Sequence, residues 1–121
     1  MRVLLVEDNE TAARSVGRAL SEETFEIAAV QLGRKVPDVI RQFKPEVLIL
    51  DVSLPHLNGV TVAALLREDW PDLPIILATR DCDADQLQLP VRTLLLPKPF
   101  AVDTLVAMIN AMTQRSSSSD L

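Results

Sequence analysis

The chain has 121 residues, of which 48% are hydrophobic and 24% are charged, as expected of one globular domain and not of a disordered segment. Lys and Arg number 12 and Asp and Glu number 17, and this formal net charge of -5 argues against direct binding of nucleic acid. A single cysteine, an acidic opening unlike a signal peptide and the lack of a membrane-length apolar run favour the cytoplasm, with no membrane contact.

The first third of the chain predicts strand, helix, strand. Val3–Val6 is a continuous aliphatic run of the kind found in strands buried on both faces. Asn9 is a candidate N-cap for a helix whose inward face is formed by Ala13, Val16, Gly17 and Leu20. Ile27–Val30 is weaker and rich in alanine, so we expect an edge strand there.

The middle of the chain repeats this alternation. Lys35–Phe43 has apolar residues at helical spacing, and Val47–Leu50 is a second buried strand. A helix is predicted from about Val60 to Glu68. Its inward face is expected to carry Val62, Leu65 and Leu66.

The last third contains two more aliphatic strands, Ile75–Ala78 and Leu94–Leu96. Between them Asp83–Leu89 is a short, weak helix candidate that Pro90 ends, so the fourth helix is expected to be shortened or irregular. The final helix, Ala101–Thr113, has one apolar stripe formed by Val102, Leu105, Val106, Ile109 and Met112.

Five strands alternating with helices predict a (βα)5 doubly wound α/β domain with a parallel sheet, over residues 1–113. We expect the strand order 2-1-3-4-5, which is taken over from flavodoxin-like proteins and is not itself readable from the pattern. Residues 114–121 contain four consecutive serines and are predicted to be a flexible tail or the start of a linker.

Three carboxylates follow two strands that would be neighbours in this order. Glu7 and Asp8 come directly after the first strand and Asp51 directly after the third. Because ligands of open parallel sheets bind beyond the carboxyl ends of the strands, we expect these acids to converge. Each acid alone would more often be a solvated loop residue; together they favour a Mg²⁺ site, since Mg²⁺ prefers oxygen ligands and compensates their mutual repulsion.

Two further side chains follow strands on the same edge of the predicted sheet. Lys98 comes after the fifth strand, where its ammonium could reach a phosphate or Asp51, and Thr79 follows the fourth strand with a hydroxyl donor. Alone, the lysine would be an exposed residue and the threonine a turn residue. The combination of an acid pair, an acceptor aspartate, a hydroxyl and a lysine is specific.

Four segments carry a resemblance to a known family: Val6–Asn9, Asp51–Gly59, Pro74–Thr79 and Pro97–Phe100. From about Arg2 to Met112 the chain resembles the response-regulator receiver domains of two-component signalling. The resemblance implies a phosphoacceptor and not an enzyme.

The resemblance also implies the role of each site residue. Asp51 would accept a phosphoryl group from a sensor histidine kinase or a small phosphodonor. Glu7, Asp8 and Asp51 would hold Mg²⁺ with the backbone carbonyl of Ser53. Lys98 would contact the phosphoryl group, Thr79 would move to bond it, and the Lys98–Pro99 bond would be cis. The output would be an effector protein or a following domain, such as one that regulates transcription, and a homodimer stays open.

Three departures from the family's usual pattern bear on the output. Leu95 stands where an aromatic residue is usual, which puts the usual switching in doubt, and Arg80 stands where a small residue is common. We hypothesise that Arg80 alters the lifetime of the phosphorylated state. The segment between Thr79 and Lys98 is shorter than usual by about one helical turn, which predicts a modified surface there.

Two alternatives remain at this point. One is a receiver-like protein-binding module with weak or atypical phosphorylation. Leu95, Arg80 and the short segment between Thr79 and Lys98 favour it slightly. The other is an enzyme on the same fold. A flavodoxin-type site would need a phosphate-binding loop where the acidic Glu7-Asp8 pair stands, and an aspartate-dependent phosphatase would need an acid in place of Ser53.

Overall fold

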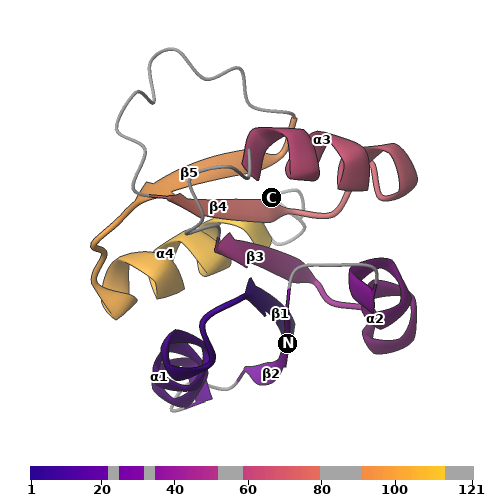
Figure 1. Ribbon diagram of the computed structural model, residues 1–121. Helices are drawn as coiled ribbons and strands as arrows, with labels where there is room; N and C mark the ends of the chain where they lie inside the picture. The colour runs from indigo at the N-terminus through magenta and orange to yellow at the C-terminus, as the bar shows by residue number, and fades with distance from the viewer. Residues whose placement is uncertain (22–24, 32–34, 52–58, 80–90, 114–121) are drawn as a thin grey trace.

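The fold is known from a computed structural model, which describes residues 1–21, 25–31, 35–51, 59–79 and 91–113 (Figure 1). Five strands form one sheet in the order β2-β1-β3-β4-β5, and every neighbouring pair is parallel. The strands are β1 (Arg2–Glu7), β2 (Glu26–Val30), β3 (Val47–Asp51), β4 (Ile75–Thr79) and β5 (Thr93–Pro97). The predicted doubly wound α/β fold and its strand order are thus confirmed.

Four helices in the described part cover the two faces of the sheet. They are α1 (Glu10–Ser21), α2 (Lys35–Phe43), α3 (Gly59–Asp69) and α4 (Val102–Thr113). Residues of α2 and α3 pack on one face and residues of α1 and α4 on the other, as Figure 1 shows. The predicted fourth helix between β4 and β5 and the predicted tail lie outside the described residues.

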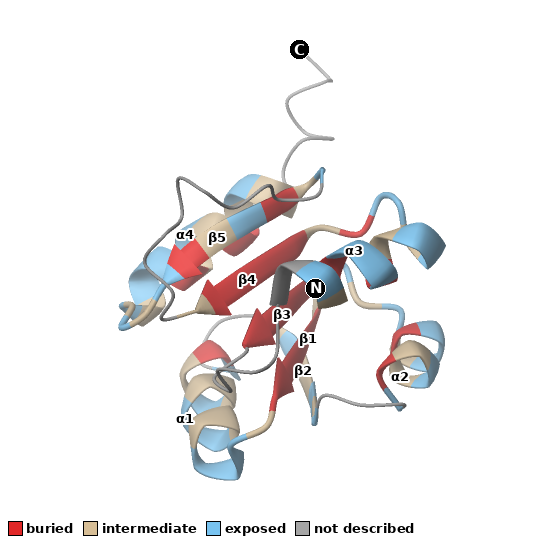
Figure 2. Ribbon diagram, turned by 45° about the horizontal axis from the view of Figure 1, so that its top comes forward, coloured by how far each residue is buried: buried red, intermediate tan, exposed pale blue. Residues whose placement is uncertain are grey.

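Side chains of the central strands alternate between the two cores. In β1, Leu4 and Val6 join the core under α2 and α3, whereas Val3 and Leu5 join the core under α1 and α4. A strand between two helical layers has no face toward solvent, so side chains on both of its faces are buried. This explains the continuous aliphatic sequence of the central strands. Figure 2 shows β1, β3 and β4 almost entirely buried, and β2 less so, as predicted for an edge strand.

The predictions for the four described helices are confirmed with one correction. Asn9 caps α1, since its Oδ1 accepts the N–H of Ala12 at 2.9 Å. The prediction that Leu65 faces inward is wrong: its side chain is 60% exposed, and Ala63 is buried instead. With about 100° between successive residues, Val62, Ala63 and Leu66 define one face, and Leu65 lies well away from its centre.

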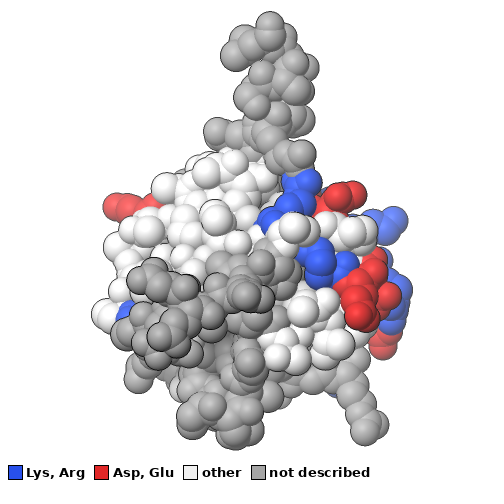
Figure 3. Space-filling view, turned by 90° about the horizontal axis from the view of Figure 1, so that it is seen from above, with Lys and Arg blue, Asp and Glu red and all other residues white. Residues whose placement is uncertain are grey.

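No helix in the described ranges is both long enough and apolar enough to cross a bilayer. On the face seen from above in Figure 3, basic side chains lie beside acidic ones. The described part of that face therefore has no extended basic patch of the kind that binds nucleic acid.

Candidate functional site

Two buried carboxyl groups lie next to each other at the carboxyl ends of β1 and β3. Glu7 and Asp51 are the last residues of these strands and are direct partners in the parallel register. Their exposed fractions are only 3% and 7%. The expected convergence of acids from the first and third strands is therefore found for this pair, in a position where water screens their charges poorly.

A lysine from the edge of the sheet reaches the same place. Lys98 directly follows β5, and its Nζ forms an ion pair with Oδ1 of Asp51. The side chains are only 14% and 6% exposed, so the pair is largely shielded from solvent. The backbone N–H of Lys98 donates to the carbonyl of Thr79 at 2.8 Å, which ties the end of β5 to the end of β4. The Lys98–Pro99 bond is cis, as the resemblance implied.

The surroundings of Glu7 favour its neutral form. Burial, followed by the facing carboxyl group of Asp51, raises the pKa of Glu7 from 4.5 to about 7. The N–H of Asn9, which donates to Oε1 at 2.9 Å, and the charge of Lys98 act in the opposite direction. Near neutral pH this carboxyl group can therefore hold or release a proton.

The remaining predicted residues lie near this centre or outside the described part. Asp8 directly follows β1 and is half-buried, and Thr79 is the half-buried last residue of β4. Ser53 and Arg80 lie outside the described residues. The strands β1, β3 and β4 each end at a predicted site residue, and Lys98 directly follows β5.

The carboxyl groups fit part of a site for a hard divalent cation. Oε2 of Glu7 is buried and has no hydrogen-bond donor, and it stands beside a second carboxylate. Mg²⁺ prefers oxygen ligands, and it typically uses only one or two carboxylates and keeps several waters. Within the described ranges, no three His, Cys, Asp or Glu side chains are gathered closely enough to form a complete metal cage.

One polar cluster was not predicted from the sequence. Arg67, in the last turn of α3, directs its guanidinium toward backbone carbonyls at the opposite end of the sheet. A basic residue in the last turn of a helix is a weak sequence signal for such contacts, because most are simply solvated.

Comparisons with known proteins identify the family. The family model described as "Response regulator receiver domain" matches residues 3–110. Response regulator MprA of Mycolicibacterium vanbaalenii is 33% identical over 99% of this chain and 53% of its own length. MprA of Mycobacterium leprae is 32% identical over 99% of this chain and 54% of its own length. The chain thus spans about half the length of these curated relatives.

Solved structures agree with this result. Response regulator TrrA from Thermotoga maritima, in complex with Mg(2+)-BeF, is 25% identical with a TM-score of 0.79, over 92% of this chain and 97% of that one. The receiver domain of Francisella response regulator 1452 supports the fold alone, at 21% identity and a TM-score of 0.82, over 95% of this chain and 98% of that one. The chain belongs to the family of response regulator receiver domains.

Proposed function

We propose that Asp51 is the phosphoacceptor of this domain and that its phosphorylation changes how the domain binds other proteins. The observation that carries the proposal is the buried ion pair between Asp51 and Lys98, next to Glu7. It joins a carboxylate nucleophile, a cation that can accompany a phosphoryl group and a second acid in one place. This combination suits phosphoryl transfer, which depends mainly on positioning and charge neutralisation.

The reaction is a displacement at phosphorus. An Asp51 carboxylate oxygen attacks the phosphorus atom, and the bond from phosphorus to the donor breaks, so that the leaving group takes the electron pair. The donor is a phosphohistidine of a sensor kinase or a small acyl phosphate, and the product is an acyl phosphate on Asp51. The ammonium of Lys98, already paired with Asp51, is placed to pair with the new phosphoryl oxygens.

The acids beside Asp51 are proposed to hold Mg²⁺. Glu7, Asp8 and Asp51 would be its side-chain ligands, together with the backbone carbonyl of Ser53. When bound, Mg²⁺ supplies positive charge that lets an anionic donor approach an anionic carboxylate. Glu7 must release its proton to act as a ligand. Because its pKa is raised, the proton competes with the metal near neutral pH.

The phosphoryl group would act as a switch. It adds charge and acceptor oxygens next to Thr79 at the end of β4, and the Thr79 hydroxyl is proposed to move toward it. The partners would be a cytoplasmic sensor histidine kinase and either an effector protein or an output domain. An output domain is proposed as one such partner because the chain spans about half the length of the response regulators that it matches.

A second function is favoured by Leu95. Its side chain is half-buried and packs against the core under α2 and α3, at the position where the family usually carries an aromatic residue. A leucine that moves between inward and outward positions cannot change the surface of the domain in the way that an aromatic ring does. The alternative is therefore a binding module that keeps the fold but responds weakly to phosphorylation.

The test is phosphorylation by a small acyl phosphate, followed by intact mass. The wild-type chain should gain one phosphoryl group only in the presence of Mg²⁺, and Asp51→Asn should gain none. Asp69→Asn is the matched control and should behave as the wild type. It changes an exposed aspartate, the last residue of α3. Unmodified wild type would overturn the proposal and favour the binding module.

A further inference from the structure

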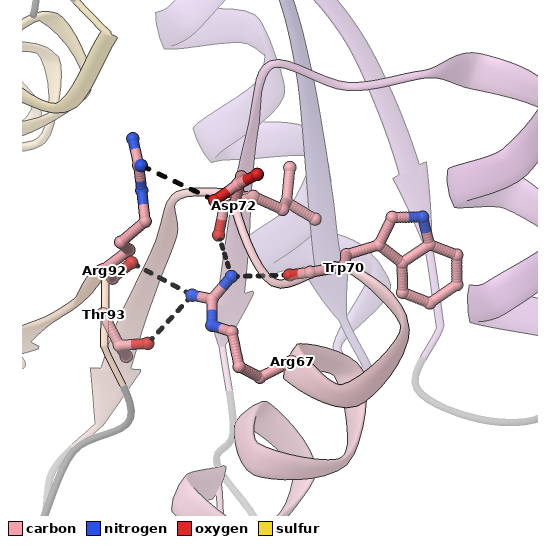
Figure 4. A network of polar contacts seen from close by, with 6 residues as sticks. Arg67, Trp70, Asp72, Arg92 and Thr93 are labelled. Atoms are coloured by element: carbon pink, nitrogen blue, oxygen red, sulfur yellow. Dashed lines mark hydrogen bonds and ion pairs between the residues drawn. The ribbon is translucent and has the colours of Figure 1, made fainter.

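Arg67 makes the most extensive side-chain contacts with backbone carbonyls in the described part of the chain (Figure 4). Its Nη1 donates to the carbonyls of Trp70 at 2.7 Å and Leu73 at 2.5 Å. Its Nη2 donates to the carbonyl of Arg92 at 3.2 Å and to Oγ1 of Thr93 at 3.3 Å. One side chain of α3 therefore holds the turn before β4 and the start of β5 together.

The acceptors at the start of β5 are themselves fixed. The carbonyl of Arg92 also accepts the N–H of Ile75 at 3.0 Å, which is the first link between β4 and β5. Thr93 is only 7% exposed, and its hydroxyl donates to the carbonyl of Val91 at 3.2 Å. Arg67 thus reaches past the start of β4 to Thr93, the first residue of β5. It contacts the Thr93 side chain and the carbonyl of the preceding residue.

The position of β5 matters because it is the last strand of the sheet. Among the described strands its only neighbour is β4, and the pairing runs from Ile75 with Thr93 to Thr79 with Pro97. Lys98 is the next residue. The candidate site is therefore built from two parts: the carboxyl groups stand on the central strands β1 and β3, whereas the ammonium arrives from an edge strand.

We propose that Arg67 is a positioning residue that holds β5 in register, and so holds Lys98 against Asp51. An edge strand with a single neighbour is less strongly fixed than a central one, and a slip by one residue would turn every side chain to the other face. Arg67 resists such a slip from the far end of the strand, and its fork-shaped guanidinium suits two simultaneous contacts. The proposal rests on the proposed function, because Lys98 matters only if Asp51 is phosphorylated.

The test compares three variants of the full chain. Arg67→Met removes the donors, and Arg67→Lys retains the charge without the fork. Thr93→Val removes one acceptor with almost no change of shape, and so keeps the test usable if Arg67→Met folds poorly. Arg41→Met is the matched control. Arg41 pairs with Asp38, and its Cζ lies 5.9 Å from the centre of the Trp70 ring. It stands on α2, which packs on β1 and β2 at the other side of the sheet from β5.

Two measurements separate a positioning role from general loosening of the fold. The first compares two quantities. One is the rate of phosphorylation by an acyl phosphate, and the other is the affinity for Mg²⁺ alone, which calorimetry measures. Arg67→Met should lower the rate about tenfold or more, since small displacements of a reacting group are costly, while the Mg²⁺ affinity stays unchanged. Arg67→Lys should recover part of the rate, and Arg41→Met should change neither quantity.

The second measurement is amide hydrogen exchange, which needs no phosphorylation. The Lys98 amide, bonded to the Thr79 carbonyl, should exchange faster in Arg67→Met and Thr93→Val, whereas β1 and β3 amides keep their protection. Equal loss of protection in all strands, or an unchanged rate with unchanged Lys98 exchange, would overturn the inference. A wild-type chain that is never phosphorylated would instead overturn the proposed function, and Lys98 exchange would still decide whether Arg67 places this residue.

Discussion

The buried carboxyl group of Glu7 should make the stability of the fold depend on pH in an unusual direction. Its pKa rises from 4.5 to about 7 on folding, chiefly because burial disfavours the charged form. The folded state thus binds this proton more tightly than the unfolded state. The resulting stabilisation is fully present below pH 4.5 and is lost as the pH rises through 7, opposite to the behaviour of an ordinary ion-paired carboxylate.

The size of the effect follows from the pKa difference. About 2.5 pH units at about 1.36 kcal/mol each amount to roughly 3 kcal/mol of unfolding free energy. Glu7→Gln removes the ionisation but keeps the size of the side chain. At pH 8.5, without a divalent cation, this variant should therefore be more stable than the wild type by about 2–3 kcal/mol, and the advantage should largely disappear at pH 5.

The assay is urea denaturation with a chelator present, across this pH range, followed by the fluorescence of Trp70, the single tryptophan. The pH dependence of the difference between wild type and Glu7→Gln isolates this group from all others. Glu26→Gln, at the exposed first residue of β2, is the matched control and should show no such dependence. If Glu7→Gln were no more stable than the wild type at pH 8.5, the burial argument would be refuted.

Three further predictions follow from the described contacts. Mg²⁺ should raise the melting temperature more at pH 8 than at pH 6, because at pH 6 it must displace the proton of Glu7; an equal rise at both values would contradict this. Asn9→Ala should cost about 1 kcal/mol of unfolding free energy, the worth of the lost cap of α1, measured by the same urea assay. Leu105→Ala, in the core under α4, should cost about 2–5 kcal/mol, whereas exposed Leu65→Ala should cost far less.

Much of the fold was readable from the sequence because its signals are strong and local. Uninterrupted aliphatic runs such as Val47–Leu50 have few alternatives to a strand buried on both faces. The inward placement of Leu65 failed for a different reason. The apolar residues of α3 cover more of its circumference than the sheet can bury, so the sequence left the phase of the helix undetermined, and packing of Ala63 and Leu66 decided it.

The candidate site was likewise predictable only in part. That Glu7, Asp51 and Lys98 meet follows from the strand order, because each comes at the carboxyl end of its strand. The altered pKa of Glu7 and the contacts of Arg67 could not be predicted. The first depends on how deeply a carboxyl group is buried, and the second on where two chain turns leave carbonyls pointing, which only the folded arrangement determines.

Chemical trapping of the phosphorylated residue tests the central claim most directly. Borohydride reduces an aspartyl phosphate to homoserine, which peptide mass spectrometry can locate after treatment with Mg²⁺ and a small acyl phosphate. Homoserine should appear at position 51 and at no other aspartate. Homoserine at Asp8 instead, or at no position in a chain that has gained a phosphoryl group, would contradict the assignment of Asp51 as the phosphoacceptor.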